Sequence, residues 1–400
     1  MNTLNFLGLI HSFKVNRYPK VEKIASMGLL GVRIAQEYSR RIDVLSEEMC
    51  YYLMDIHSSL LPSEPKHFLR MVKPRSDIFY NLEFYDNDPF AYSHVTQVYR
   101  ATLKNGMDCS IKVIDEKSKK DFLNDIYSIE KGIRVFSKMS PVMARMFFAQ
   151  DIIENIKEST LEKMDLKKEI KYTGYLAGIC EDYKDSYRLH NLKFPRIFKE
   201  LSTEDYIVGE YISGRNVKEI LNEKKMKYHK FLEIMRYHLF YIFVIGSFHS
   251  DIHAGNIIIG DKGDVYFIDC NSITDIDDEF RINFYNFLVE LCEGNYENST
   301  RYLNKLSRTL IPDKKYLNFK KRSREIFAQA GNKKIKEFQF SRKIMSLFRA
   351  AAENGMTFDK NLYPLLKALI RLEEMAYRTL PEAFFVKDLR NELRRYEDSI

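Results

Sequence analysis

One octapeptide of the sequence carries the residue types that phosphoryl transfer requires. It reads His-Ser-Asp-Ile-His-Ala-Gly-Asn from His249 to Asn256, and a further aspartate, Asp269, follows after two apolar runs. Phosphoryl transfer needs a carboxylate beside the attacking hydroxyl group and oxygen ligands for a magnesium ion. Asp251 would be the base or orienting carboxylate, and the side-chain oxygens of Asn256 and Asp269 would hold the metal.

The spacing of these residues is that of the kinase catalytic loop, H-x-D-x-x-x-x-N, followed by the aspartate of a D-F-G motif. The alternative is structural, because aspartate and asparagine often cap turns, and an isolated H-x-D would favour that interpretation. The complete octapeptide, in register with a predicted hairpin and then Asp269, favours the catalytic interpretation.

A second candidate for chemistry is Lys112, which lies in an alternating run of apolar residues. It matches the strand lysine of the V-A-I-K motif, whose compact charge contacts the α- and β-phosphates of ATP. A lysine on a strand is usually only solvated, but this one lies in a predicted hairpin ahead of the catalytic loop. Its partner should be a glutamate on a helix between it and Glu210. Glu169 is the best candidate, while Glu162 and Glu154 also fit the spacing.

The elements that would position these residues follow from hydrophobic periodicity. Apolar residues near a 3.6-residue period predict helices through the first 70 residues, with a stop at Pro62 and Pro65. Alternation between residues 90 and 114 predicts two antiparallel strands, joined by a hairpin turn at Asn105 and Gly106. The predicted turn places Lys112 in the second of these strands.

The rest of the chain is predicted to be mainly helical. Helical sequence over 117–184 leads to a buried strand over 206–211, and helices follow residue 216 except for two short strands over 256–259 and 265–268. The predicted class is α+β, a two-lobed protein-kinase-like fold. Its parts are a helical extension (1–75), a small β-containing N-lobe with a helical insertion (76–214) and a helical C-lobe (215–400).

The composition limits the class of protein. With 400 residues and 45% hydrophobic content, the chain can bury a substantial core. The five cysteines form no C-x-x-C pair, which predicts free thiols in a reducing compartment. The net charge of +7 is distributed over mixed runs of both signs, so we expect no nucleic-acid partner.

The apolar segments predict a cytoplasmic protein. The longest mainly apolar run, over residues 239–248, is about half of the roughly 18 to 20 residues that span a bilayer, and the N-terminus does not resemble a secretory signal. One N-terminal helical face is apolar and is followed by basic residues, and such a helix can lie peripherally on an anionic membrane. The alternative is an ordinary helix packed against its own domain. The apolar face consists of Phe6, Leu9, Ile10 and Phe13, and the basic residues are Lys14, Arg17, Lys20 and Lys23.

Four blocks of this sequence resemble the UbiB/AarF family of atypical kinases, also called the AarF-domain-containing kinases. The first, Q-E-Y-S-R-R-I-D over 36–43, is similar to the family's G-Q-x-x-S-x-R-x-D in its N-terminal extension. The second, over 89–112, occupies the family's alanine-rich nucleotide loop and the strands around it. The third runs from 194 through the hinge at 208–214 to the catalytic loop, and the fourth, over 366–373, resembles a C-terminal helix.

The resemblance implies a kinase-like fold that uses ATP and magnesium. It also implies ATPase activity or phosphorylation of a small or lipid-like molecule, in support of isoprenoid quinone (ubiquinone) or other lipid biosynthesis, with a biosynthetic protein complex as partner. By position it brings Gln36 into the catalytic cleft, and it places Ala91, Ser93 and Thr96 in the nucleotide loop and Glu210 at the hinge.

Three departures from the family pattern predict a divergent member. K-x-G-Q appears as R-I-A-Q from Arg33 to Gln36, and arginine does not replace lysine faithfully at a site built around a point charge. The alanine-rich loop carries Tyr92 and His94 where small residues would let backbone amides approach phosphate. D-F-G reads D-C-N from Asp269.

Two other functions fit the same residues. Small-molecule phosphotransferases of the aminoglycoside or choline type also use an H-x-D-x-H-x-x-N loop, but they lack the block over 36–43. A nucleotide-binding pseudokinase that acts as a scaffold would account for the altered phosphate loop. Retention of Lys112, Asp251, Asn256 and Asp269 together favours an enzyme.

Overall fold

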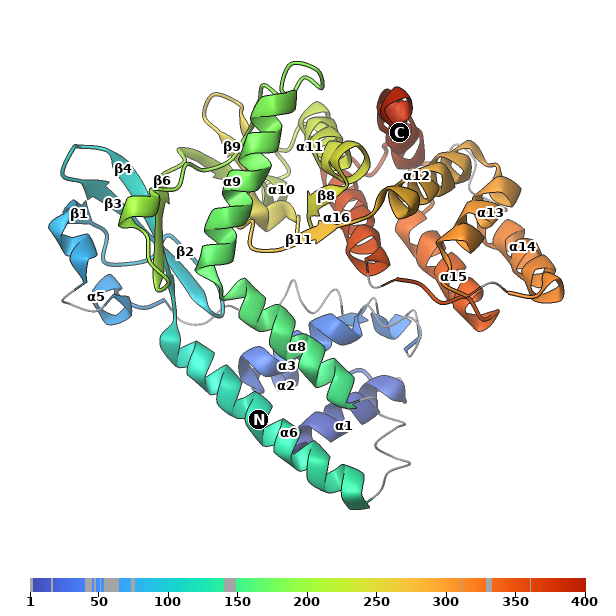
Figure 1. Ribbon diagram of the computed structural model, residues 1–400, viewed down its shortest axis with the longest axis horizontal. Coiled ribbons are helices and arrows are strands. Elements are labelled where there is room, and N and C mark those ends of the chain that lie inside the picture. Colours follow the sequence, from blue (N-terminus) through green and yellow to red (C-terminus); the bar gives the residue numbers. More distant parts are fainter. Residues whose placement is uncertain are drawn as a thin grey trace. The chain divides into compact units, whose positions relative to one another are not determined.

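The computed structural model describes residues 3–15, 17–39, 45–46, 48–50, 52–53, 65–72, 76–139, 149–309, 311–328, 333–359 and 361–400. The chain forms two compact units, coloured along the sequence in Figure 1. The first comprises residues 1–170 and 196–211, and the second comprises residues 171–195 and 212–400. Residues 171–195, which the sequence prediction put in the range 76–214, thus belong to the second unit. Within the described ranges, no helix is long and apolar enough to cross a bilayer.

The first unit is built on one antiparallel sheet. Its strands in spatial order are β1 (Leu82–Tyr85), β3 (Thr96–Leu103), β4 (Asp108–Ile114) and β6 (Tyr206–Glu210), and β2 (Ala91–Tyr92) also pairs with β3. The predicted hairpin is confirmed, since β3 and β4 pair over seven residues and Gly106 turns between them with φ of +79°. A positive φ is accessible to glycine because it has no Cβ.

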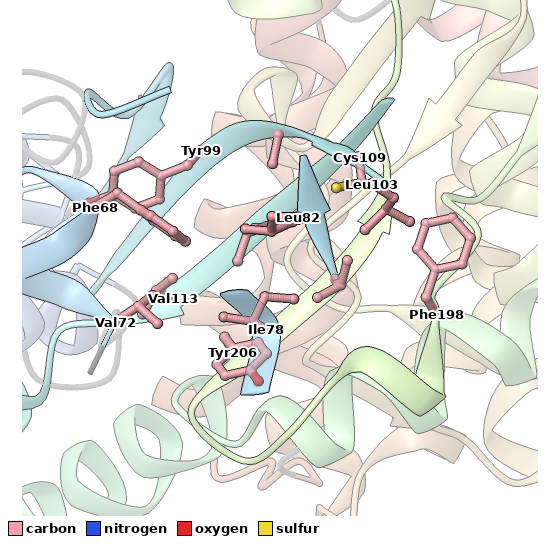
Figure 2. Close-up of a cluster of buried hydrophobic side chains, with 13 residues drawn as sticks. Phe68, Val72, Ile78, Leu82, Tyr99, Leu103, Cys109, Val113, Phe198 and Tyr206 are labelled. Atoms are coloured by element: carbon pink, nitrogen blue, oxygen red, sulfur yellow. The ribbon is translucent and has the colours of Figure 1, made fainter. Parts of the chain in front are cut away.

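The inward side chains of this sheet form the hydrophobic core drawn in Figure 2. Tyr99, Ile111 and Val208 are fully buried there, together with Phe68 from the short helix α5 (Phe68–Met71). Burying one such side chain contributes roughly 1.5–3 kcal/mol. Because successive residues of a strand point to opposite faces, burial of Ile111 in the core turns Lys112 to the other face of the sheet.

The helices of the first unit precede the sheet in sequence or lie between its strands. They are α1 (Thr3–Lys14), α2 (Val21–Ala25), α3 (Gly28–Tyr38), α5, η1 (Asp77–Tyr80), α6 (Glu116–Met139), α8 (Ala149–Lys163), the first residues of α9 (Leu166–Tyr183) and η2 (Lys199–Leu201). The predicted helix stop at Pro62 lies outside the described residues.

The apolar face of α1 is packed inside the first unit. Its four apolar residues are completely buried, and the ring of Phe13 lies 5.5 Å from that of Tyr38 in α3. The face that was considered for membrane contact is therefore occupied by the protein's own core, as in the alternative interpretation.

The second unit is mainly helical. Its elements are β5 (Leu192–Lys193), β7 (Gly214–Asn216), α10 (Val217–Asn222), α11 (Tyr228–Phe240), the π-helical turn η3 (Tyr241–Ile245), β8 (Ser247–His249), η4 (Ala254–Asn256), β9 (Ile257–Gly260), β10 (Val265–Phe267), β11 (Ile273–Asp275), α12 (Asp278–Glu293), α13 (Tyr296–Leu306), α14 (Asp313–Phe327), α15 (Phe340–Glu353), α16 (Leu362–Thr379), α17 (Phe385–Leu393) and η5 (Arg394–Ser399). The strands form two small sheets, β5-β10-β9-β7 and β11-β8.

The predicted α+β class is confirmed, and the predicted strands near 256–268 are β9 and β10. The prediction that the remaining chain after residue 216 is helical was wrong for β8 and β11. These strands have three residues each, and such short strands show no alternation in the sequence because their partner strand defines them.

Candidate functional site

The candidate catalytic loop begins where β8 ends, beside its partner strand β11 (Figure 1). The backbone N–H of Ser250 donates to the carbonyl of Ser272 at 3.0 Å, and their hydroxyl oxygens share a hydrogen bond at 2.7 Å. These contacts hold the residue before Asp251 against the segment that follows Asp269.

The ring of His249 links the same two segments. Its Nε2 donates to the carbonyl of Ile268 at 3.1 Å, and its Nδ1 accepts the backbone N–H of Asp251 at 3.2 Å. Burial lowers the pKa of His249, outweighing the opposite effect of the negative charges of Asp251 and Asp269. The ring is therefore neutral, which is the state in which one ring nitrogen donates and the other accepts.

Asn256 closes the loop from its other end. Its side-chain Nδ2 donates to the backbone carbonyl of Asp251 at 3.1 Å. Its backbone carbonyl accepts the N–H of Ile268 at 3.0 Å. With the amide nitrogen used in this way, the amide oxygen is the atom with which Asn256 can bind a cation.

The turn between Asp251 and Asn256 packs the ring of His253 closely against Gly255. The Nδ1 of His253 accepts the N–H of Gly255 at 3.0 Å, and the side chain of Asn216 donates to the carbonyl of Gly255 at 2.7 Å. A Cβ on Gly255 would approach the His253 ring to 2.9 Å. The second histidine of the octapeptide is thus a turn residue in this structure.

Asp269 has an unusual backbone conformation for a residue with a side chain. Its φ is +63°, and it is one of three non-glycine residues in the described ranges with a positive φ. Such a conformation costs on the order of 1–3 kcal/mol and persists where surrounding contacts enforce it, often at functional sites. The N–H of Asn271 donates to the carbonyl of Asp269 at 2.8 Å, which contributes to that enforcement.

A residue that the sequence did not identify as a site residue contacts Asp251. The Nζ of Lys367, in α16, hydrogen-bonds to Oδ1 of Asp251, and the two side chains are 20% and 17% exposed. The residues are 116 positions apart, so no local spacing relates them. The only signal was the C-terminal block over 366–373, in which Lys367 had no predicted role.

In the first unit, Lys112 pairs with Glu169. Its Nζ lies 2.8 and 2.7 Å from the two carboxylate oxygens of Glu169, and both side chains are largely buried. Of the other two glutamates that fitted the spacing, Glu162 pairs with Lys168 at 2.9 Å and Glu154 is exposed. Packing thus selects one of the three candidates as the lysine's partner.

The predicted nucleotide loop is a tight turn of the β2–β3 hairpin, in which Ala91 pairs with Val98. The hydroxyl of Ser93 accepts the N–H groups of Val95 and Thr96 at 3.2 and 3.1 Å, and the N–H of Ser93 donates to the carbonyl of Thr96 at 2.8 Å. Three backbone amides of this turn, those of Ser93, Val95 and Thr96, are therefore hydrogen-bonded within the turn itself.

Two residues that depart from the family pattern, Arg33 and His94, interact electrostatically. Arg33 donates from Nη1 to Oε1 of Gln36 at 2.8 Å, within α3. Burial and, to a lesser extent, the charge of Arg33 lower the pKa of His94. The part of the N-terminal block over 40–43 lies outside the described residues.

Glu210 ends β6 and holds the neighbouring backbone. Its Oε2 accepts the N–H of Arg196 at 3.2 Å, and its N–H donates to the carbonyl of Arg196 at 2.8 Å. The first unit thus carries the candidates for nucleotide binding, and the second carries Asp251, Asn256 and Asp269.

Comparison with known proteins gives consistent results. Residues 70–303 match the ABC1 atypical kinase-like domain. The chain is similar to the probable protein kinase UbiB of Pseudomonas fluorescens, with 22% identity over 375 residues that cover 90% of this chain and 67% of the relative. It is also similar to the protein of the same name from Pseudomonas aeruginosa, with 21% identity over 369 residues that cover 90% and 68% of the two chains.

Among solved structures, the chain is similar to the complex of Rv3197 with erythromycin from Mycobacterium tuberculosis. The TM-score is 0.44 and the identity 15%, over 78% of this chain and 80% of that chain.

Proposed function

This chain belongs to the ABC1 atypical kinase-like family, and from that premise we propose that it is a magnesium-dependent ATPase or small-molecule kinase. The matched range, 70–303, contains Lys112, Glu169, Asp251, Asn256 and Asp269. The α+β fold is kinase-like, in agreement with this family match.

The observation that carries the proposal is the connection between the catalytic loop and the Asp269 segment. His249 bonds to both segments, and the backbone of Asn256 bonds to Ile268 directly before Asp269. A fixed relation between a carboxylate and two oxygen ligands is what phosphoryl transfer requires of a protein, because the chemistry depends on positioning and charge stabilisation.

Each residue has a proposed role in this scheme. Asp251 orients the attacking hydroxyl group and accepts its proton. Lys112 contacts the α- and β-phosphates of ATP, and Glu169, which holds its ammonium group at 2.7 Å, keeps it in place. Gln36, Ala91, Ser93, Thr96 and Glu210 are proposed to line the nucleotide site.

The donor set of Asn256 and Asp269 fits magnesium. Both offer oxygen, and a magnesium ion bound with a nucleotide needs only one or two carboxylates because phosphates and water supply its other ligands. In the described ranges, no group of three or more His, Cys, Asp or Glu side chains is arranged so that it could hold a metal ion without other ligands. When bound, the ion would stabilise the charge that develops on the phosphoryl oxygens.

The acceptor is proposed to be water or a small, lipid-like molecule, and the pathway to be isoprenoid quinone or other lipid-like biosynthesis within a protein complex. The similarity to proteins named UbiB supports this assignment. The proposal includes no membrane contact through α1, because the apolar face of that helix is buried.

A second candidate function is a nucleotide-binding pseudokinase. The observation that favours it is the β2–β3 turn, whose amides are bonded to Ser93 and Thr96 within the turn. Membership of the ABC1 family does not favour the third alternative, an aminoglycoside- or choline-type phosphotransferase.

The test is ATP turnover by the purified chain with and without magnesium, in the wild type and in Asp269→Asn. We expect magnesium-dependent phosphate release that falls by about 100-fold or more in Asp269→Asn, because a neutral amide replaces the charged ligand. The matched control is Asp261→Asn, since Asp261 is exposed and its carboxylate accepts a hydrogen bond from the hydroxyl of Ser213.

Three outcomes separate the candidates. Turnover that Asp269→Asn leaves unchanged contradicts the metal assignment. An ATP-dependent rise in melting temperature without turnover in the wild type favours the pseudokinase. Equal losses in Asp269→Asn and Asp261→Asn would point to a general loss of folded protein.

A further inference from the structure

We infer that Lys367 is a positioning residue for Asp251: its ammonium group holds the carboxylate in the orientation that accepts the proton of the attacking hydroxyl group. The inference rests on the proposed function and adds a residue to its site. The contact joins Nζ of Lys367 to Oδ1 of Asp251, and both side chains are largely withdrawn from solvent.

The backbone that carries Lys367 is anchored on both sides. Near the start of α16, the side chain of Asn361 donates to the carbonyl of Asp275 in β11, the strand that pairs with β8 ahead of Asp251. Further along α16, the buried carboxylate of Glu373 accepts the N–H groups of Phe340 and Ser341 at 2.6 and 2.7 Å. Lys367 therefore projects from a helix that is hydrogen-bonded both to β11 and to the start of α15.

The contact with Lys367 acts on the carboxylate of Asp251, which the backbone bonds of the loop do not reach. The backbone bonds of the loop fix the main chain of Asp251 through His249 and Asn256, but they do not fix its carboxylate plane. The last torsion of an aspartate side chain is broad, so the plane rotates unless a strong contact holds it. A charge-assisted hydrogen bond to one oxygen is such a contact.

The same ammonium group has an electrostatic effect. ATP brings several negative charges to the site, and the carboxylates of Asp251 and Asp269 add two more. A cation in contact with Asp251 offsets part of the repulsion between this carboxylate and the phosphates. Burial is the main cause of the lowered pKa of His249, the residue that bonds to the backbone of Asp251, and the charge of Lys367 lowers that pKa further.

In the proposed reaction Lys367 exchanges no proton. The attacking oxygen forms a bond to the γ-phosphorus while the bond from that phosphorus to the β–γ bridging oxygen breaks. ADP leaves with the electron pair of the broken bond, and the proton of the attacking hydroxyl passes to Asp251. Lys367 acts on this step only by holding the carboxylate that takes the proton.

The experiment compares Lys367→Met and Lys367→Arg with Arg371→Met in the full chain. Arg371 is the matched control, because it is also a partly buried cation on α16 but pairs with Glu374 of its own helix. We expect kcat for ATP turnover to fall about 10- to 100-fold in Lys367→Met, with KM for ATP changed by less than about twofold. Lys367→Arg should restore part of the loss, and Arg371→Met should stay within about twofold of the wild type.

Asp251→Asn provides a second readout. Because Lys367 acts through Asp251, Lys367→Met in an Asp251→Asn background should cause less than about twofold further loss of residual turnover. If Lys367→Met does not fold, as judged by its melting curve, Lys367→Gln keeps a donor without the charge and replaces it in the same assays.

The outcomes are distinguishable from those of the proposed function. A wild type without ATP turnover overturns the proposed function and this inference together. A wild type with turnover, combined with an unchanged or raised kcat in Lys367→Met, overturns the inference alone. So do a loss shared by Arg371→Met, a change confined to KM, or losses that multiply in the double variant.

Discussion

The candidate catalytic loop of the second unit and the β2–β3 turn of the first unit differ in how they use their hydrogen bonds. In the loop, the bonds of His249 and Asn256 go to backbone atoms and fix the main chain that carries Asp251, whose carboxylate contacts Lys367. In the turn, the hydroxyl of Ser93 accepts the backbone N–H groups of Val95 and Thr96. The loop positions charged side chains, whereas the turn forms hydrogen bonds to its own backbone amides.

The difference bears on how much of the proposed ATP binding depends on side chains. If the amides of the turn are engaged, the charge of Lys112 must supply more of the attraction for the phosphates than it would beside an open loop. Variants of the two regions should therefore have different kinetic signatures.

The largest effect in the first unit is expected at Lys112. Lys112→Met should weaken ATP binding by about 10- to 100-fold, because hydrogen bonds to charged groups are worth about 1.5–3 kcal/mol. ATP titration followed by melting temperature measures the change. Because removing one member of a largely buried pair strands the other charge, the double variant Lys112→Met/Glu169→Gln serves as the control for stability.

An unchanged affinity for ATP in both Lys112 variants would contradict the inference that Lys112 supplies attraction for the phosphates. It would mean that the turn binds phosphate after rearranging, with no requirement for the lysine.

An intermediate effect is expected from pH in the second unit, where His238 and His249 are both buried. Burial lowers the pKa of His238 to about 3, and it also lowers that of His249. An unfolded histidine takes up a proton near pH 6.5, so stability is complete above that pH and is lost as pH falls below it. Each group contributes about 1.4 kcal/mol per pH unit within its window.

His238→Phe tests the pH prediction. Neither ring nitrogen of His238 has a hydrogen-bond partner, and its ring packs edge to face on Phe248, so a phenyl ring is a suitable replacement. Denaturant unfolding at pH 7.5 and pH 5.5 should show a smaller loss of stability in the variant. The same loss in both proteins would show that His238 is not a source of the pH dependence.

The smallest effect is expected at Ser93. Ser93→Ala removes the hydroxyl that bonds to two amides, so the unfolding free energy should fall by about 0.5–1.5 kcal/mol. The released N–H groups become available to phosphate, and ATP affinity should rise by about two- to tenfold. The matched control is Ser202→Ala, whose hydroxyl also bonds to backbone groups of the first unit. A lower ATP affinity in Ser93→Ala alone would indicate that the Ser93 hydroxyl itself binds the nucleotide.

Much of the fold followed from local patterns. The turn at Gly106, the alternation around Lys112 and the strands β9 and β10 appear in the structure where their residues predicted them. These features depend on side chains within a few positions of one another. The pair β8–β11 was missed because its residues are too few for a pattern and are stabilised by each other.

Local sequence patterns predicted the candidate site only in part. The spacing from His249 to Asn256 marked the loop, but nothing in that spacing indicated that His249 bonds to Ile268 or that His253 closes a turn. Both facts depend on how the loop folds back on itself.

The sequence by itself determined the α+β class, the catalytic-loop motif and the resemblance to atypical kinases, because residue type, periodicity and spacing are local properties. Only the tertiary structure decided that Glu169, of three glutamates, pairs with Lys112, and that Lys367 contacts Asp251 from 116 residues away. Packing also decided that the apolar face of α1 is buried. Contacts between distant residues depend on which helices and strands pack together, and the spacing of residues along the chain does not contain that information.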